Sequence, residues 1–409
     1  MLEFTEEQRL IRSEIRNLCS AFDDEYWREK DRRREYPMEF VRALGEHGWL
    51  GTVIPEEYGG AGLDPLEAAI VLEEITASGA GFNGAMACHG AMFIPRSVLN
   101  YGSESMKREV LPEIASGEKL LQCFSLTEPG AGFDSTSITT SAERVERSST
   151  SDASPEATQN GDTYVVNGQK VWTSRYHASD YMVLVARTTP KEEVESKVDG
   201  LSLFLVDLED AEAQGAVETE EIEKNIRAAV PSYEVWFEDL EIPAQNLIGE
   251  EGKGFRQVLD GLNEERLVIA AECLGLGEVA LERGIEYARE REVFGGPIGS
   301  NQAVQQPLAE AYADHHAAKG VIYRAADRLD DLDREAAGAR ANVAKYLAAE
   351  AAFAAADAAV QTHGGYGVAR EYDVERYFRE ARLTRLVPIT QQLALNYLGE
   401  RVLGLPRSY

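Results

Sequence analysis

The chain has 409 residues, of which 44% are hydrophobic, enough for two or three domains with cores of their own. Its formal net charge of −30 argues against nucleic acid as a partner, because phosphates would be repelled. No apolar run reaches the roughly 18 residues that cross a bilayer, and the acidic N-terminus does not resemble a signal peptide. We therefore expect a cytoplasmic protein without stable membrane insertion.

Lysine is scarce, since it supplies ten of the 41 basic residues. A highly acidic, lysine-poor globular chain leads to the hypothesis of a halophilic source, which activity confined to dilute buffer would contradict. The four cysteines form no CxxC pair, so zinc ribbons and thioredoxin-type redox chemistry are not expected. No metal site is predicted, and buried reduced thiols are the expected state of the cysteines.

The first 121 residues are predicted to form helices joined by loops. Apolar residues recur at helical spacing, and Thr5 is a suitable N-cap for the first helix. The expected helices are Phe4–Phe22, Pro65–Ser78, Pro95–Tyr101 and Ser103–Ala115.

Residues 122–245 change to short segments rich in β-branched and aromatic residues, which predicts strands. Asn167-Gly168 is predicted to be a hairpin turn. The polar stretch Ser141–Asn160 is expected to be a surface insertion or a mobile loop. The expected strands are Thr163–Asn167, Tyr181–Ala186, Leu201–Asp207 and Tyr233–Phe237.

Residues 246–409 return to helical periodicity. Four long segments with an apolar face are enough for a bundle, namely Gly252–Gly277, Glu278–Arg291, Gln302–Leu332 and Arg334–Gln361. The sequence thus predicts an α+β protein of three domains: an N-terminal helical domain (1–121), a central β-barrel-like domain (122–245) and a C-terminal four-helix bundle (246–409).

Two segments of the central region combine small residues, hydroxyls and aromatic rings. Phe124–Asp134 (FSLTEPGAGFD) is suited to pressing its backbone and a Thr hydroxyl against a flat ring, although a plain Gly-Pro loop explains it equally well. Gly161–Ser174 (GDTYVVNGQKVWTS) is also explained by a β-hairpin with a core Trp.

Two further patterns lie in the helical C-terminal region. Arg291, followed by Phe294 and Gln302, is a cation of the type that holds phosphates bidentately; an exposed helix-end Arg is the alternative. The glycines after Gln361 either cap a helix or seat a phosphate group.

These motifs, taken in order, resemble the acyl-CoA dehydrogenase family over nearly the whole chain. The C-terminal segment QTHGGYGVAREYDVERYFRE carries the most specific part of the resemblance. It implies bound FAD, an acyl-CoA substrate, an electron-transfer flavoprotein as partner, and a homotetramer. The implied FAD-binding residues are Phe124, Leu126, Thr127, Gly132, Phe133, Trp172, Ser174, Arg291, Phe294, Gln302, Gln361, Gly364 and Gly365, with Arg291 and Gln302 reaching the cofactor partly across a subunit boundary. Phe133 stands where the family usually has Ser.

The family's usual catalytic glutamate is missing. Counting from Arg379, its position falls on Pro388, which also lacks the backbone N–H that holds the thioester oxygen. In branched-chain and long-chain members the base precedes an Arg on another helix, and Glu265 occupies that position, with Glu264 as the fallback. The resemblance assigns Phe133, Asn263 and Arg266 to the substrate.

The leading hypothesis is FAD-dependent α,β-dehydrogenation of an acyl-CoA thioester to a trans-2-enoyl-CoA, with Glu265 as the base. Pro388 motivates the alternative, a family member without ordinary dehydrogenase activity, either monooxygenase-like or a non-catalytic subunit. A non-catalytic acyl-CoA-binding scaffold is a third hypothesis, which the retained FAD-facing residues oppose.

Overall fold

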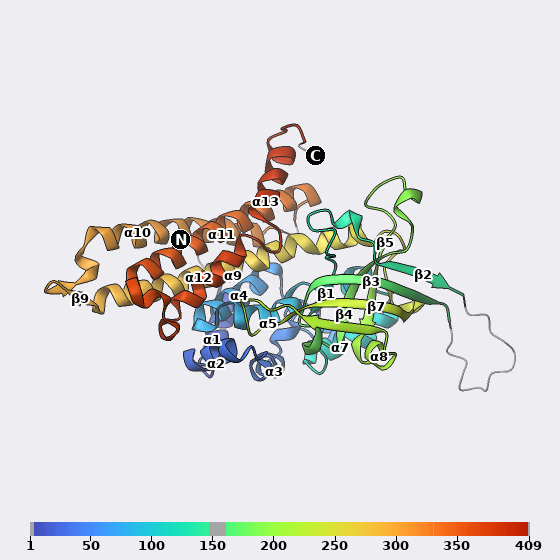
Figure 1. Cartoon of the computed structure of the whole chain (residues 1–409), viewed down its shortest axis with the longest axis horizontal. Coiled ribbons are helices and arrows are strands. Elements are labelled where there is room, and N and C mark those ends of the chain that lie inside the picture. The colour runs from blue at the N-terminus through green and yellow to red at the C-terminus, as the bar shows by residue number, and fades with distance from the viewer. Residues whose placement is uncertain (1–3, 147–160, 330, 408–409) are drawn as a thin grey trace.

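The computed structural model describes residues 4–146, 161–329 and 331–407. An N-terminal helical domain, a central sheet domain and a C-terminal helical domain follow one another along the chain, as the sequence predicts. Figure 1 shows the sheet at one end of an elongated molecule and the long C-terminal helices running to the other end.

The N-terminal helices begin where capping residues are available. Thr5 forms a capping box with Gln8 at the start of the first helix, and Ser103 accepts from the backbone N–H of Met106. The helices are α1 (Glu6–Cys19), α2 (Asp24–Arg33), α3 (Met38–Glu46), α4 (Pro65–Ile75), α5 (Gly81–Cys88), α6 (Pro95–Tyr101) and α7 (Glu104–Ser116). The four helices expected here are confirmed: α6 has the predicted bounds, α1 and α4 are shorter than predicted, and α7 is shifted by one residue.

The central sheet is mixed, with strand order β6-β7-β3-β2-β4-β5-β8 and β1 paired in parallel with β4. Its strands are β1 (Cys123–Ser125), β2 (Ser141–Val145), β3 (Thr163–Ser174), β4 (Tyr181–Arg187), β5 (Leu201–Asp207), β6 (Val217–Glu221), β7 (Ser232–Pro243) and β8 (Leu247–Ile248). A short helix α8 (Leu208–Ala213) follows β5.

Two details of this region correct the sequence expectations. Asn167-Gly168 is not a hairpin turn, because both residues lie inside β3, at a bulge against β7. Gly168 has φ of 150°, and a Cβ there would lie 2.6 Å from the Cα of Thr140. The polar stretch expected as a loop begins with β2, and its residues 147–160 lie outside the described part of the chain.

The C-terminal domain is built on three long helices: α9 (Gly254–Glu290), α10 (Gln302–Ala326) and α11 (Arg334–His363). Shorter helices α12 (Val374–Thr384) and α13 (Gln391–Tyr397) follow, and a small hairpin, β9 (Glu292–Val293) with β10 (Gly296–Pro297), joins α9 to α10. The predicted break at Gly277 is wrong, since α9 is continuous over 37 residues.

The largest hydrophobic core joins the first and last domains. Buried residues of α1 to α5 pack with those of α9 to α12 in one cluster, whereas two other clusters lie within and beside the sheet. All four cysteines are buried and free. Within the described ranges, no helix is both long and apolar enough to cross a membrane.

Candidate functional site

Hydrogen bonds join two predicted ligand-binding segments in the sheet domain. Lys170 on β3 is fully buried, and its Nζ donates to the Leu126 carbonyl (3.0 Å) and to Glu128 Oε1 (2.9 Å). The backbone N–H of Val171 donates to the carbonyl of Thr127 (2.9 Å). The structure therefore brings together seven predicted residues, the sheet group: Phe124, Leu126, Thr127, Gly132, Phe133, Trp172 and Ser174.

Two aromatic rings of the sheet group are exposed. Trp172 is 54% exposed and Phe133 is 62% exposed, and both have positive φ, which non-glycine residues seldom adopt. A Cβ on Gly132 would meet nothing within 4 Å. Exposed rings beside open backbone suit a flat heteroaromatic ligand, so these residues fit the flavin that the motifs imply.

Ser174 is held by groups that the sequence analysis did not identify. Its Oγ lies 2.9 Å from Ser232 Oγ on β7, and Arg227 Nη2 donates to both hydroxyls, at 2.9 and 3.0 Å. Arg227 belongs to the loop between β6 and β7 and is half-buried. Nothing in the periodicity of residues 222–231 marks this arginine, because its role depends on Ser174, 53 residues earlier in the chain.

The other predicted cofactor residues form a second set, the helix-end group: Arg291, Phe294, Gln302, Gln361, Gly364 and Gly365. Tyr287, one turn before Arg291, stacks on His363 with ring centroids 4.1 Å apart, and His363 directly precedes Gly364. The end of α9 and the glycine cluster are therefore neighbours. Phe294 is fully exposed, with φ of 57°.

The two groups lie far apart within one chain. Helix α9 starts beside β5 and ends just before Arg291, and 37 residues at 1.5 Å each span about 55 Å. Figure 1 accordingly shows β9 at the opposite end of the molecule from β3 and β7. One chain does not bring all the predicted cofactor residues together.

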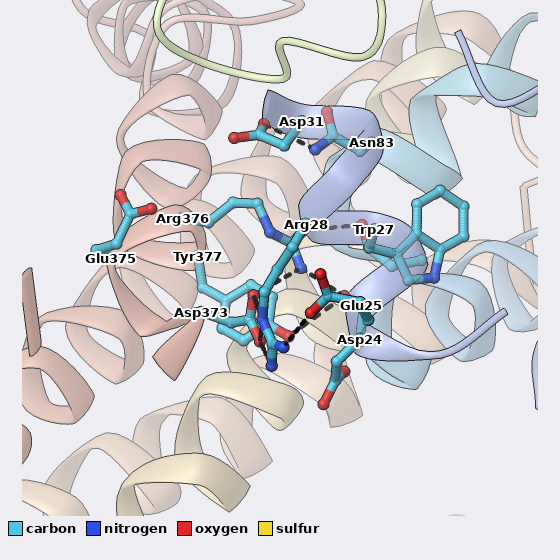
Figure 2. A network of polar contacts seen from close by, with 12 residues as sticks. Asp24, Glu25, Trp27, Arg28, Asp31, Asn83, Asp373, Glu375, Arg376 and Tyr377 are labelled. Carbon is cyan, nitrogen blue, oxygen red and sulfur yellow. Dashed lines mark hydrogen bonds and ion pairs between the residues drawn. The ribbon is translucent and has the colours of Figure 1, made fainter. Parts of the chain in front are cut away.

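The charged residues that follow the glycine cluster fasten α12 to the N-terminal helices. Arg376 is fully buried and donates to the carbonyls of Gly79 (2.8 Å) and Ala80 (3.0 Å). Glu380 accepts from the backbone N–H of Phe82 (2.9 Å). Figure 2 shows Arg28 of α2 reaching Asp373, at 2.9 Å between Nη2 and Oδ2. This part of the C-terminal signature has a structural role.

Glu265 lies on α9, and its side chain is half-buried. Burial raises the pKa of its carboxyl above the ordinary glutamate range, against the opposing charges of His89, Arg266 and Arg175. The neighbouring Glu264 instead forms an ion pair with Arg96, at 2.9 Å between Oε2 and Nε. Glu265 is therefore the better candidate for a base.

The two predicted substrate residues beside Glu265 contact each other. Arg266 Nη1 donates to Asn263 Oδ1 at 2.7 Å, and burial lowers the pKa of this arginine. Asn263 is buried, whereas Arg266 is half-buried. Both side chains lie on α9 within one turn of Glu265.

The segment that carries Pro388 is anchored next to these residues. Buried Lys345 on α11 donates from Nζ to the Ile389 carbonyl (2.6 Å) and to Gln391 Oε1 (2.9 Å). Burial is the main cause that lowers the pKa of Lys345 to about 8, and the charge of the nearby Arg266 contributes in the same direction. The segment Leu386–Thr390 thus lies near the α9 site and offers no carboxylate.

A second buried acid lies two turns beyond Glu265 on the same helix. Glu272 is fully buried, and its Oε1 lies 3.0 Å from His89 Nδ1. Residues seven apart share one face of a helix, so Glu272 and His89 neighbour the candidate base. Sequence analysis missed this pair, because a glutamate in an apolar helix and a lone histidine carry no motif.

The comparisons with known proteins agree with this geometry. Family models described as the N-terminal, middle and C-terminal domains of acyl-CoA dehydrogenase match residues 5–118, 123–240 and 252–403. Acyl-CoA dehydrogenase FadE12 of Mycobacterium tuberculosis is 34% identical over 408 residues, covering 99% of this chain and 98% of that protein. Cyclohex-1-ene-1-carbonyl-CoA dehydrogenase of Syntrophus aciditrophicus is 32% identical, covering 98% and 91%.

Solved structures show the same likeness. The glutaryl-coenzyme A dehydrogenase–glutaryl-CoA complex has a TM-score of 0.87 at 31% identity, covering 100% of this chain and 98% of that one. A chain in the structure titled as the electron transferring flavoprotein of Acidaminococcus fermentans has a TM-score of 0.87 at 29% identity, covering 98% and 99%. The chain therefore belongs to the acyl-CoA dehydrogenase family, whose members are flavin-dependent oxidoreductases acting on CH–CH bonds.

Proposed function

We propose that this chain binds FAD and oxidises an acyl-CoA thioester to the trans-2-enoyl-CoA, with Glu265 as the base. The carrying observation is the position of Glu265: a half-buried carboxylate with a raised pKa, directly before Arg266, whose charge acts on the Lys345 that binds the segment with Pro388. A raised pKa suits a base that works near neutral pH.

In this proposal Glu265 removes the proton α to the thioester carbonyl. Bound FAD supplies the acceptor for the β-hydrogen and its electron pair. Trp172 and the Thr127 segment hold the ring, while Ser174 offers it a hydroxyl. Arg266, fixed by Asn263, keeps a positive charge beside the base.

The thioester oxygen needs hydrogen-bond donors as negative charge develops on it. Pro388 has no backbone N–H to offer, and the loss of one such donor costs on the order of 3 kcal/mol of transition-state stabilisation. The role then falls to a ribityl hydroxyl of FAD, a neighbouring amide or a solvent molecule.

We further propose that each complete cofactor site is shared between two subunits of a homotetramer. The support is the separation of about 55 Å along α9 between the sheet group and the helix-end group. One FAD molecule contacts both groups when the sheet group of one subunit meets the helix-end group of another, where Arg291 would face the pyrophosphate.

We infer that the reduced cofactor passes its electrons to an electron-transfer flavoprotein in the cytoplasm. The similarity to a chain in an electron transferring flavoprotein structure supports this partner. Loss of reoxidation when that flavoprotein is omitted from an anaerobic assay would be the expected result.

The test is anaerobic reduction of the FAD-loaded protein in high salt by a panel of straight and branched saturated acyl-CoAs. Loss of the visible flavin absorbance reports the reaction. We expect Glu265→Gln to slow it by roughly 10²–10⁴-fold with FAD still bound, as for removal of a general base. Glu264→Gln is the matched control, since Glu264 is paired with Arg96, and it should still be reduced.

The opposite outcomes are equally informative. Reduction of Glu265→Gln at the wild-type rate would move the base elsewhere. A wild-type protein that holds FAD yet is reduced by none of the thioesters would favour the monooxygenase-like or non-catalytic alternative that Pro388 suggests.

A further inference from the structure

Arg227 carries a charge whose local partners do not neutralise it. In the described part of the chain, its hydrogen bonds go to the neutral hydroxyls of Ser174 and Ser232 and to Met86 Sδ, at 3.8 Å. No carboxylate of the described residues forms an ion pair with it. A half-buried cation beside neutral groups is costly unless negative charge is supplied from elsewhere.

The hydrogen bonds around Ser174 determine where its hydroxyl proton points. Ser232 is fully buried, and among the described residues its Oγ contacts only Ser174 Oγ and Arg227, so its proton points to Ser174. Ser174 Oγ then accepts from both Ser232 and Arg227. Its own proton is left to point outward, because the alternative acceptor, the Trp172 carbonyl, lies 3.5 Å away, at the limit for a hydrogen bond.

Burial lowers the pKa of Arg227 to about 9, the neighbouring Arg175 acts in the same direction, and the carboxylate of Glu272 opposes both without forming an ion pair with Arg227 in the described residues. Arg227 therefore remains protonated at neutral pH. The backbone φ of Arg227 is 43°, a value that residues other than glycine seldom adopt. The surrounding loop therefore holds Arg227 in this position at a conformational cost.

We propose that Arg227 is a positioning residue for the flavin: it holds Ser174 as a hydrogen-bond donor toward the ring, and its charge stabilises the reduced ring. This inference rests on the proposed function. When the β-C–H bond breaks, a hydride carries two electrons and a proton to the neutral oxidised ring, and the α-proton passes to Glu265. The ring gains one negative charge, which a nearby fixed cation favours.

The test measures the reduction potential of bound FAD by anaerobic dye-linked titration, which needs no acyl-CoA turnover. Arg227→Met is expected to keep FAD but to disfavour the reduced form at least tenfold, which for a two-electron couple is about 30 mV more negative. Arg227→Lys keeps the charge and should recover part of this shift. Ser232→Ala, which removes one of the two donors to Ser174 Oγ and so weakens the orientation of its hydroxyl, should move the potential the same way by a smaller amount.

Arg187→Met is the matched control. Arg187 is another arginine of the sheet domain, buried and donating to the carbonyls of Ile138 (3.0 Å) and Thr136 (2.8 Å). We expect its loss to lower thermal stability without moving the potential. If Arg227 only linked β3 to β7 structurally, Arg227→Met would lower the thermal stability and leave the reduction potential unchanged, as expected for Arg187→Met.

The inference and the proposed function fail in different ways. FAD-loaded Arg227→Met with an unchanged potential would overturn the inference alone. If that variant does not fold, an unchanged potential in FAD-loaded Arg227→Gln, which also removes the charge, would overturn it. A wild-type protein that binds no FAD would overturn both.

Discussion

Replacing Lys170 by methionine is expected to destabilise the protein by about 3 kcal/mol and to weaken FAD binding. Lys170 is fully buried, and Glu128 is 5% exposed, so methionine would leave a carboxylate buried without its counterion. Breaking a buried pair from one side costs roughly 3–5 kcal/mol.

The pKa values support the lower end of that range. Burial alone would raise the pKa of Glu128, but Lys170 and the Thr139 and Thr140 donors lower it to about 2. A lowering from 4.5 to about 2 corresponds to about 3.5 kcal/mol, at about 1.4 kcal/mol per pKa unit, and Lys170 shares this total with the threonine donors. After the substitution the carboxylate still accepts from the backbone N–H groups of Thr139 (2.7 Å) and Thr140 (2.9 Å).

Urea unfolding of the FAD-loaded protein, together with its FAD content, measures the effect. Lys253→Met is the control, because its pair with Asp199 is exposed and worth about 1 kcal/mol at most. The double variant Glu128→Gln/Lys170→Met should be less destabilised than Lys170→Met alone, since no buried charge remains. A loss below about 1 kcal/mol for Lys170→Met would refute the reasoning.

The remaining predictions concern pH and helix packing. The pKa of Glu128 in the folded state lies below its unfolded value. Ionised Glu128 therefore stabilises the folded protein fully above about pH 4.5, and this stabilisation is lost as the pH falls toward about 2. Acid unfolding should accordingly be less steep in Glu128→Gln. The rate of flavin reduction by acyl-CoA should rise with pH through a pKa above that of ordinary glutamate, a dependence that stopped-flow measurements should find missing in Glu265→Gln. Gly275→Ala should cost about 1–3 kcal/mol, because its Cβ would lie 2.3 Å from the Glu73 carbonyl, whereas Gly261→Ala on the same helix has open space and should stabilise by up to about 1 kcal/mol in thermal unfolding.

Local signals in the sequence predicted many of the elements. Strand β5 has the predicted bounds, Leu201–Asp207, and helix α6 has the predicted bounds, Pro95–Tyr101. At the start of α1, Thr5 makes the predicted cap. In each case a few neighbouring residues decide the conformation, through side-chain alternation, a proline at the first helical position or a hydroxyl cap.

The errors arise where distant contacts override local preference. The glycines of Leu274–Gly277 (LGLG) favour a break in α9, yet a Cβ on Gly275 or Gly277 would meet Glu73 or His315 of the packed helices. These glycines let helices approach closely instead of ending one. Gly168 likewise admits the backbone at Thr140 and does not form a turn.

The same distinction between local signals and distant contacts applies to the candidate site. Motif order along the chain predicts the two cofactor groups and Glu265, because each motif is a short stretch of sequence. The residues that surround these groups, such as Arg227 beside Ser174 and the Glu272–His89 pair near Glu265, include partners from other elements. Their roles depend on pairing between β3 and β7 and on packing of α9, which no local pattern encodes.

The length of α9 ties cofactor binding to assembly. If one FAD molecule contacts the sheet group of one subunit and the helix-end group of another, neither subunit alone offers a full set of contacts. Binding of FAD then favours the assembled state, and assembly raises the affinity for FAD by the same factor, because the two equilibria are linked. Under this arrangement Arg291→Gln should lower both FAD affinity and resistance to dissociation on dilution, although Arg291 lies about 55 Å along α9 from its own subunit's sheet domain.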